Sequence, residues 1–494
     1  MLLLGYVDLE RRPVIDALVR APTNMGASPA VDGRACNIQR VHDAGMKWIL
    51  VQDRLDAEIR YAGDCMNTGT PTQSPIPRLA ALRYRDFRLF WVGGLIASIG
   101  AQMLMIGVNW HVYRLLQGDA WTIAVDGRDI AINGQALGLG ALGFVRVLPI
   151  MVFSLLGGVL ADSLDRRRLI IGAHGVAALF ATLLAVCTLS HHVNLAVIFA
   201  LTAASGAASA LYGPATDALA PQLVEKQHLT NAISLTSLEW AVGSIAGPAL
   251  AGIAITALSL GSVYLCSAAS SVAMILAVGM VRHRGPAGGS GVRVSVQSLL
   301  EGVRFTRGTS IIWGTMLLDF WATFFSSART MLPIVADKML GVGVQGYGLL
   351  STAQPTGALV AALAMALRRD IRRQGTLLLG GVALYGAATA LFGLSSSFAL
   401  SYALFALTGV GDMVSTVIRG NIRQMRTPNE LRGRLNSVHL MLALGGPQLG
   451  ELEAGVVAAV LGVSVTLVSG GILTVVLAGW VAWKYRDLRD VDRA

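Results

Sequence analysis

Seven charged side chains lie inside long apolar stretches of this 494-residue chain, more than two residues from either end of the stretch. A charge is expensive in hydrocarbon surroundings, so a residue kept there is by default a hypothesis about function. A carboxylate in an apolar cavity takes up a proton more readily than one in water, and a buried cation and anion can form a gate. These positions therefore predict reversible protonation or gating. The seven are Arg146, Glu239, Asp319, Arg329, Asp412, Glu451 and Glu453.

The composition indicates what surrounds these charges. Apolar residues make up 54% of the chain and charged residues only 14%, and the mean hydropathy is +0.60. Soluble proteins are about 45–50% apolar and about 25% charged, so a water-soluble globule is disfavoured. Twelve apolar stretches are each long enough to cross a bilayer as a helix. The predicted spans are Leu89–Leu116, Ala136–Ala161, Leu169–Leu189, Val193–Thr216, Ala232–Ala257, Gly261–Val281, Ile311–Val335, Tyr347–Leu367, Thr376–Leu394, Ala399–Ile418, Leu435–Val460 and Val463–Trp483.

The basic residues follow the rule that Lys and Arg gather in cytoplasmic loops. Eighteen of them lie in loops after even-numbered spans, whereas Arg128 and Lys338 lie in loops after odd-numbered spans. Both termini are therefore expected in the cytoplasm. This topology also explains the net charge of +10, because the basic residues form no single patch that would favour nucleic acid as a partner.

The spans fall into two groups of six, separated by a Gly- and Arg-rich segment. The loops after spans 4 and 10 resemble each other, and Leu229 in the first matches Leu431 in the second. This internal repeat favours two homologous halves. The predicted organisation is a polar extension at 1–85, a bundle at 86–281, a cytoplasmic linker at 282–310, a second bundle at 311–484 and a cytoplasmic tail at 485–494.

The polar extension has the features neither of a spanning helix nor of a secretory signal. Two interpretations stay open: a flexible cytoplasmic tail, or a translation start placed too early, with Met66 as the true first residue. A third hypothesis, of another functional class, is a membrane sensor or enzyme that works through this extension. We disfavour it because the extension carries no catalytic constellation.

The most specific local motif lies between the second and third spans. Its two glycines allow close helix packing, and its acidic residues beside three arginines suit a charge lock that opens and closes with conformation. The alternative is a basic cluster that only sets topology. The motif residues are Gly157, Gly158, Asp162, Asp165, Arg166, Arg167 and Arg168.

A second motif lies in the fifth span, where Gly243, Gly247, Pro248 and Gly252 occur in series. Glycine and proline in series bend a helix and let it pack closely on a neighbour. On spacing alone, a general packing face explains these residues equally well.

Together the two motifs resemble those of the major facilitator superfamily. The first is similar to its GxLaDrxGrkxxl loop, and the second to the GxxxGPxxGG motif of its exporters, from which Ala251 departs. Stretches 220–224, 327–333 with Ala336 and Asp337, and 427–436 are similar to the branch that contains enterobactin exporters and related transmembrane secretion effectors. The added segment Trp121–Gln135 departs from that branch.

The resemblance implies an all-α integral membrane protein with twelve transmembrane helices in two pseudo-symmetric six-helix bundles, the major facilitator fold. It implies a monomeric, multi-pass transporter of the bacterial cytoplasmic membrane, not an enzyme, that exports a small amphipathic molecule such as a drug or siderophore in exchange for protons. An importer or lipid flippase of the same fold stays open as an alternative. No cofactor or metal is expected, because the chain has no P-loop and its four cysteines lack metal-ligand spacing.

The resemblance also places spans 2 and 11 face to face across the two halves. Arg146 is therefore predicted to pair with Glu451 or Glu453 as an outer gate, unless it snorkels or caps a carbonyl within its own half. Because span 7 lines the cavity in this superfamily, Asp319 is the first candidate for a proton or substrate-amine site. Glu239 is the second candidate.

Two further pairs share a helix face because their members are seven residues apart. Gln102 and Asn109 in the first span suit an amphipathic ligand, although helix packing accounts for them equally well. Asp412 and Arg419 in the tenth span are predicted to form a structural ion pair.

Overall fold

The structure is a computed structural model that describes residues 79–125, 128–163, 165–282, 304–368, 371–428 and 431–489. The polar extension up to residue 78, with Met66, and most of the linker lie outside the described residues. The expectations for those two segments therefore stay predictions.

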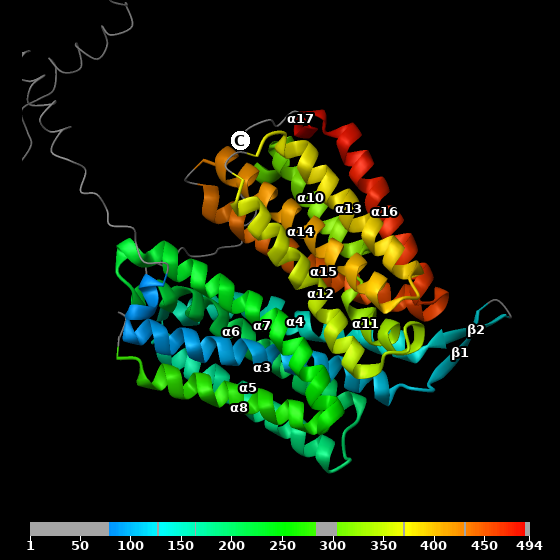
Figure 1. Cartoon of the computed structure of the whole chain (residues 1–494), viewed down its shortest axis with the longest axis horizontal. Coiled ribbons are helices and arrows are strands. Elements are labelled where there is room, and N and C mark those ends of the chain that lie inside the picture. The colour runs from blue at the N-terminus through cyan, green and yellow to red at the C-terminus, as the bar shows by residue number, and fades with distance from the viewer. Residues whose placement is uncertain are drawn as a thin grey trace, which may run out of the picture. The chain divides into compact units, whose positions relative to one another are not determined.

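The first six long helices form one bundle, drawn from blue to green in Figure 1. They are α3 (Arg85–Leu115), α4 (Gly134–Ser163), α5 (Arg166–Leu189), α6 (Leu195–Leu219), α7 (Leu229–Ala257) and α8 (Leu260–Met280), with the short 3-10 helices η2 (Ala80–Arg83), η3 (Ala220–Leu223) and η4 (Lys226–His228).

The remaining helices form the second bundle, drawn from yellow-green to red. Its long helices are α10 (Ser310–Phe325), α12 (Gly343–Ala366), α13 (Gln374–Leu394), α14 (Phe398–Arg426), α15 (Arg432–Leu461) and α16 (Val463–Lys484). Its short elements are η5 (Arg329–Met331), α11 (Leu332–Ile334), the π-helix η6 (Val335–Met339) and α17 (Arg486–Arg489).

Within the described residues, eleven helical segments are long and apolar enough to cross a membrane. The expected twelfth span, number 11 in chain order, is the 30-residue helix α15, which carries Glu451 and Glu453. The all-α architecture with two six-helix bundles agrees with the prediction from the sequence.

Polar residues in the connections fix where several helices begin. The side chain of Asp165 accepts a hydrogen bond from the Arg167 backbone N–H at 2.9 Å and caps α5. Asn194 caps α6 in the same way through Val197. Such caps satisfy backbone groups that would otherwise be unpaired at a helix start.

The seventh span differs from the prediction of one continuous helix over Ile311–Val335. The helix α10 ends at Phe325, and η5, α11 and η6 follow as short turns. The Ser326 hydroxyl lies 2.7 Å from that of Thr474 on α16, while Pro333 has no N–H to continue a helical ladder. These local preferences divide the segment into a helix and a compact cap.

The added segment Trp121–Gln135 contains an antiparallel β-hairpin of β1 (Ala120–Val125) and β2 (Arg128–Asn133). Its register runs from Ala120 opposite Asn133 to Val125 opposite Arg128. In Figure 1 the hairpin projects beyond the helices, and β2 contacts α4 and α15. We call this side of the molecule the hairpin end, and the opposite side, where α8 ends and α10 begins, the linker end.

The apolar cores show how the two bundles are joined. One cluster of buried side chains, the shared core, takes residues from both bundles at the hairpin end, including Trp110, Tyr113, Leu332 and Tyr347. Each of the other three clusters found among the described residues belongs to a single bundle. The bundles therefore share an apolar core at the hairpin end.

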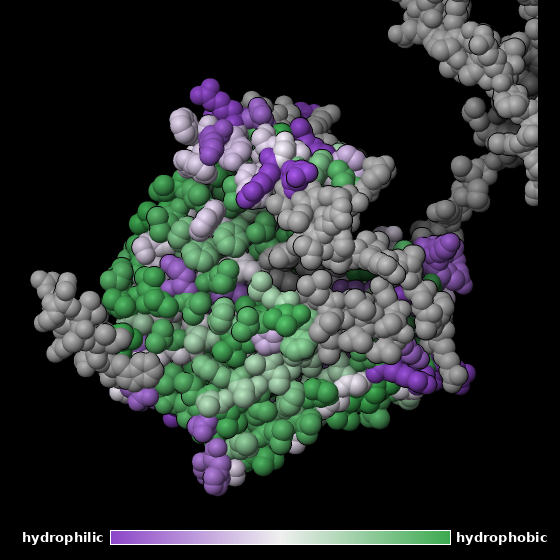
Figure 2. Space-filling view, turned by 180° about the vertical axis from the view of Figure 1, so that it is seen from behind, coloured by the Kyte–Doolittle hydropathy of each residue, from purple (hydrophilic) through white to green (hydrophobic). Residues whose placement is uncertain are grey.

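The outer surface is apolar over a wide area. Figure 2 shows, on the face that it draws, a broad hydrophobic surface with hydrophilic side chains gathered toward the upper and right-hand edges. Large apolar side chains such as Leu179, Trp240 and Leu276 are more than half exposed. Contiguous exposure of this kind is typical of a surface that faces lipid.

Candidate transport site

The helices that correspond to spans 2 and 11, α4 and α15, meet through small residues. A Cβ atom added at Gly140 would lie 2.7 Å from the Gly455 Cα atom, so the two backbones are in contact. One added at Gly143 would lie 2.5 Å from the Glu451 Oε2 atom. The buried Glu451 carboxylate therefore packs on Gly143, one helical turn from Arg146.

Arg146 itself binds the first helix of its own bundle. Its Nη2 donates to the Asn109 Oδ1 atom at 3.3 Å, and the Asn109 Nδ2 donates across the bundle boundary to the Tyr347 hydroxyl at 3.3 Å. The Trp110 ring stacks on Tyr347 with centroids 5.9 Å apart. The structure thus brings together Arg146 and Asn109, two residues that the sequence analysis treated separately.

The predicted pairing of Arg146 with a glutamate has a different outcome. Among the residues that the structure describes, no ion pair joins Arg146 to Glu451 or Glu453. Arg146 and Glu451 nevertheless both interact electrostatically with the buried Tyr347 hydroxyl, so the two charges lie near the same group.

A second polar connection between the bundles was not identified from the sequence. The Tyr113 hydroxyl donates to the Asp337 Oδ2 atom in η6 at 2.5 Å, and the Lys338 ammonium donates to the Gln135 side-chain oxygen. The Gln135 amide in turn donates to the Tyr113 carbonyl at 3.0 Å. The adjacent charges Asp337 and Lys338 at the end of an apolar stretch were the available signal, but Lys338 entered the argument only as a topology marker.

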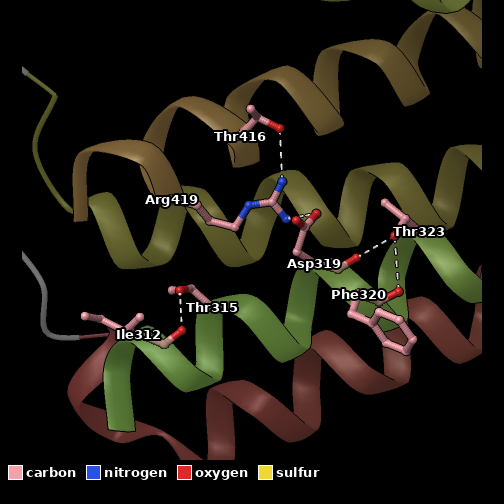
Figure 3. Close-up of polar contacts among 7 residues, drawn as sticks. All are labelled: Ile312, Thr315, Asp319, Phe320, Thr323, Thr416 and Arg419. Carbon is pink, nitrogen blue, oxygen red and sulfur yellow. Dashed lines mark hydrogen bonds and ion pairs between the residues drawn. The ribbon is translucent and has the colours of Figure 1, made fainter. Parts of the chain in front are cut away.

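Asp319 lies inside the second bundle and forms an ion pair with Arg419, as Figure 3 shows. Both residues are 8% exposed. The Arg419 Nη2 also donates to the Thr416 hydroxyl at 3.0 Å. The prediction that Arg419 pairs with Asp412 is therefore wrong for this conformation: the guanidinium crosses from α14 to α10, because Asp319 faces it there.

A small polar cavity adjoins this ion pair, lined by Asp319, Arg419, Asp412 and Ser415, with Tyr385 on α13. It has space for roughly one water molecule. Two buried atoms at this site, the Arg419 Nε and the Ser415 Oγ, have no hydrogen-bond partner among the described residues. Such atoms are costly to bury unpaired, so the cavity is suited to a polar occupant or to movement of the charged groups.

The second proton candidate, Glu239, lies in the other bundle. A Cβ atom added at Gly94 on α3 would lie 2.5 Å from the Glu239 Oε1 atom, and Glu239 is half-buried. Asp319 and Glu239 are therefore in separate bundles and do not form one site. Among the described residues, no group of three or more His, Cys, Asp or Glu side chains could hold a metal ion.

The glycines of the fifth-span motif have identifiable contacts. A Cβ atom added at Gly243 would overlap the Ser98 hydroxyl, and one added at Gly247 would lie 2.5 Å from the Gln102 Cβ atom. Gly252 instead faces the second bundle, where an added Cβ would lie 3.2 Å from the Gly348 Cα atom. The motif thus packs α7 on α3 at one end and on α12 at the other, which also explains the position of Gln102.

The described part of the loop motif between α4 and α5 binds within the first bundle. Besides capping α5, Asp165 lies 4.0 Å from the Arg168 Nε atom. Arg166 donates to the Ala218 carbonyl on α6 at 3.3 Å, and Arg167 donates to the Gly279 carbonyl on α8. The other motif residues, Gly157, Gly158 and Asp162, belong to the last turns of α4, and their side-chain surroundings are outside what the structure describes.

Two membrane-embedded bundles that share a core at one end, with charged residues in their interior, define a transporter of the major facilitator fold. Residues 76–494 match the family model described as transmembrane secretion effector, and the chain belongs to that family.

Curated relatives agree with this assignment. The enterobactin exporter EntS of Escherichia coli O9:H4 (strain HS) is 25% identical over 384 residues, which cover 78% of this chain and 88% of the relative. EntS of Shigella boydii serotype 18 gives the same values.

Solved structures show the fold alone. The nucleoside transporter NupG matches with a TM-score of 0.62 at 14% identity, over 81% of this chain and 99% of NupG. A bacterial homologue of the iron transporter ferroportin in an inward-facing state matches with a TM-score of 0.61 at 17% identity, over 82% of this chain and 99% of the homologue.

Proposed function

We propose that this protein exports a small amphipathic molecule across the bacterial cytoplasmic membrane by alternating access, in exchange for protons. The observation that carries the proposal is the shared core, which joins the two bundles at the hairpin end, whereas the cores toward the linker end belong to single bundles. Two rigid bodies held together at one end are the starting point for a rocking movement.

The orientation in the proposal places both termini and the linker in the cytoplasm. The excess of Lys and Arg in the loops on the linker side supports this orientation. The hairpin end, where the two bundles share a core, is then the closed outer face. The ferroportin homologue with the same fold is in an inward-facing state.

The proposed substrate class is a drug- or siderophore-like molecule. Support comes from the relatives named as enterobactin exporters and from the fifth-span glycines, which resemble an exporter motif and hold α7 on both α3 and α12. A mostly apolar molecule with a few polar groups fits a path between apolar helices.

Asp319 is the proposed proton site. The carboxylate is buried and forms its ion pair with Arg419, so the gain or loss of one proton decides whether that ion pair exists. A group whose charge controls a contact between α10 and α14 can couple proton transfer to helix movement.

The outer gate in the proposal consists of Arg146 with Asn109, Tyr347 and Glu451. These side chains lie where α3, α4, α12 and α15 meet, and Asn109 already bonds to Tyr347 across the boundary. We propose that Arg146 exchanges Asn109 for Glu451 or Glu453 as the bundles move, and that the charges of the Asp165 motif lock the opposite face in the other conformation.

The test is transport by the purified protein in proteoliposomes of known orientation, with an imposed pH gradient and a fluorescent amphipathic cation or enterobactin as substrate. The expected result is that substrate moves away from the cytoplasmic side of the protein, and that this movement depends on a proton gradient directed toward the cytoplasmic side. Movement only in the opposite direction would identify an importer, and movement of labelled phospholipid alone would identify a flippase. Either result contradicts the proposal.

A further inference from the structure

The starting observation is the incomplete bonding of Arg419. One terminal nitrogen faces Asp319 and the other donates to Thr416, whereas the buried Nε has no partner among the described residues. A guanidinium has five N–H donors in a fixed plane, and a buried donor without an acceptor carries the cost of its lost hydration. The present position of Arg419 therefore leaves part of its bonding capacity unused.

A second carboxylate borders the same cavity. Asp412 precedes Arg419 by seven residues on α14, which places both on one helix face, and both line the cavity next to Asp319. The unpaired hydroxyl of Ser415 lies between them in the sequence and also lines the cavity. The cavity thus contains two carboxylates and one guanidinium, and the ion pair found in it uses Asp319.

Charge balance limits what happens when Asp319 takes up a proton. A guanidinium remains charged under all ordinary conditions, so neutral Asp319 would leave Arg419 as a buried cation without an anion. This state is strongly unfavourable unless another carboxylate takes over. Asp412 is the other carboxylate that lines the cavity.

The remaining charged and titratable groups around the pair cannot take this role, because none of them is a carboxylate. The side chains that act electrostatically on Asp319 or Asp412 from the neighbouring elements are Tyr385 on α13, Arg423 on α14, His439 on α15 and Arg329 in η5. Arg329 is exposed and donates to the Gln354 side chain at 3.0 Å.

We propose that Asp412 is the alternate anchor of Arg419: when Asp319 binds a proton, the guanidinium leaves it and pairs with Asp412 across the cavity. The proton comes from solvent and stays on the Asp319 carboxyl group, while Arg419 and Asp412 both keep their charges throughout, so the site gains one proton and one positive charge. Loss of that proton returns Arg419 to Asp319. The inference rests on the proposed role of Asp319 as the proton site, and it assigns Asp412 a positioning role that acts through Arg419.

The test is a double-mutant cycle read as thermal stability of the full chain in detergent, which requires no transport. In the native background Arg419 forms its ion pair with Asp319, and Asp412 acts on it only at longer range, so Asp412→Asn is expected to lower Tm slightly. In the Asp319→Asn background Arg419 depends on Asp412, and the same substitution is expected to lower Tm at least twice as far. Neighbouring residues that share a partner are non-additive in this way.

Matched controls make each outcome decisive. Glu453→Gln, a half-buried carboxylate on another helix, is expected to lower Tm equally in both backgrounds. If the Asp319→Asn/Asp412→Asn variant does not fold, adding Arg419→Gln removes the unpaired cation and is expected to restore folding. Equal effects of Asp412→Asn in both backgrounds, or failure of Arg419→Gln to rescue, overturn the proposal.

A transport measurement separates this inference from the proposed function. In proteoliposomes, Asp412→Asn is expected to move half-maximal gradient-driven efflux to a pH about one unit lower, because protonating Asp319 then leaves Arg419 unpaired. A non-additive stability cycle without any proton-driven transport would keep the alternate anchor and reject proton antiport. Proton-driven transport with an additive cycle and an unchanged pH profile would keep proton antiport and reject the alternate anchor.

Discussion

The Tyr113 hydroxyl at the end of α3 donates a hydrogen bond to the Asp337 carboxylate in η6, 2.5 Å away and in the other bundle. Lipid supplies no hydrophobic force between helices, so bundle contacts inside a membrane depend on packing and on polar bonds of this kind. The bond lies beside the shared core, in which Tyr113 is fully buried. Polar bonding and close packing thus hold the same end of the molecule closed.

Removing that hydroxyl tests its role directly. Tyr113→Phe leaves the carboxylate of Asp337 without a donor and is expected to weaken closure of the hairpin end by about 1.5–3 kcal/mol. Spin labels on the two bundles at the hairpin end should then show a larger population at long distance. Tyr402→Phe, which removes a bond to Thr352 within the second bundle, serves as the control and should leave the distances unchanged.

A methyl group at the contact between α7 and α12 should impair transport. A Cβ atom at Gly348 would lie 2.6 Å from the Pro248 carbonyl oxygen, so Gly348→Ala forces two backbones apart. We expect a loss of about tenfold or more in transport rate, which corresponds to about 1.4 kcal/mol. Gly380→Ala, at a helical glycine with open space around it, should retain the native rate. Equal rates for the two variants would contradict the close-contact argument.

Asp319→Asn should abolish efflux driven by a pH gradient. An asparagine cannot exchange a proton, and it cannot hold Arg419 by charge. Exchange of labelled for unlabelled substrate without a gradient should persist, because it requires no net proton movement. Asp487→Asn, at an exposed carboxylate on α17, is the control for the loss of an acidic group. Undiminished gradient-driven efflux by Asp319→Asn would reject this proton site.

The outer gate can be tested by exchanging charges. Arg146→Glu and Glu451→Arg should each reduce transport, because each leaves like charges next to the buried Tyr347. The double exchange Arg146→Glu/Glu451→Arg should restore part of the activity if the two side chains pair during the cycle. If activity stays as low as in the single variants, Arg146 acts through Asn109 alone.

Asp165 combines a cap with a charge, and two substitutions separate these functions. Asp165→Ala removes both and should cost about 1 kcal/mol of stability. Asp165→Ser keeps an acceptor for the Arg167 N–H but removes the charge next to Arg168, so stability should stay near native. If the motif is a charge lock, both variants lose transport alike, whereas a cap alone predicts a loss only for Asp165→Ala.

The sequence sufficed for the architecture because lipid leaves few choices for an apolar stretch of about 20 residues. It also singled out Asn109 and Asp319, which are buried, and Arg146, which is half-buried. It did not predict that Arg419 would choose Asp319 over Asp412, because helix periodicity relates residues on one helix and says nothing about a neighbour on another. The broken seventh span was missed for a similar reason, since hydropathy does not detect turns set by Ser326 and Pro333.

Among the glycines that the structure describes, contacts between the bundles occur at two places, Gly140 with Gly455 and Gly252 with Gly348. Two points define a line, and this line runs from the α4–α15 contact to the α7–α12 contact. Because no side chains interlock at these glycines, one bundle can rotate relative to the other about that line while the backbones stay in contact. The displacement then grows with distance from the line, so helix ends far from the glycine contacts move most while the glycines remain in place.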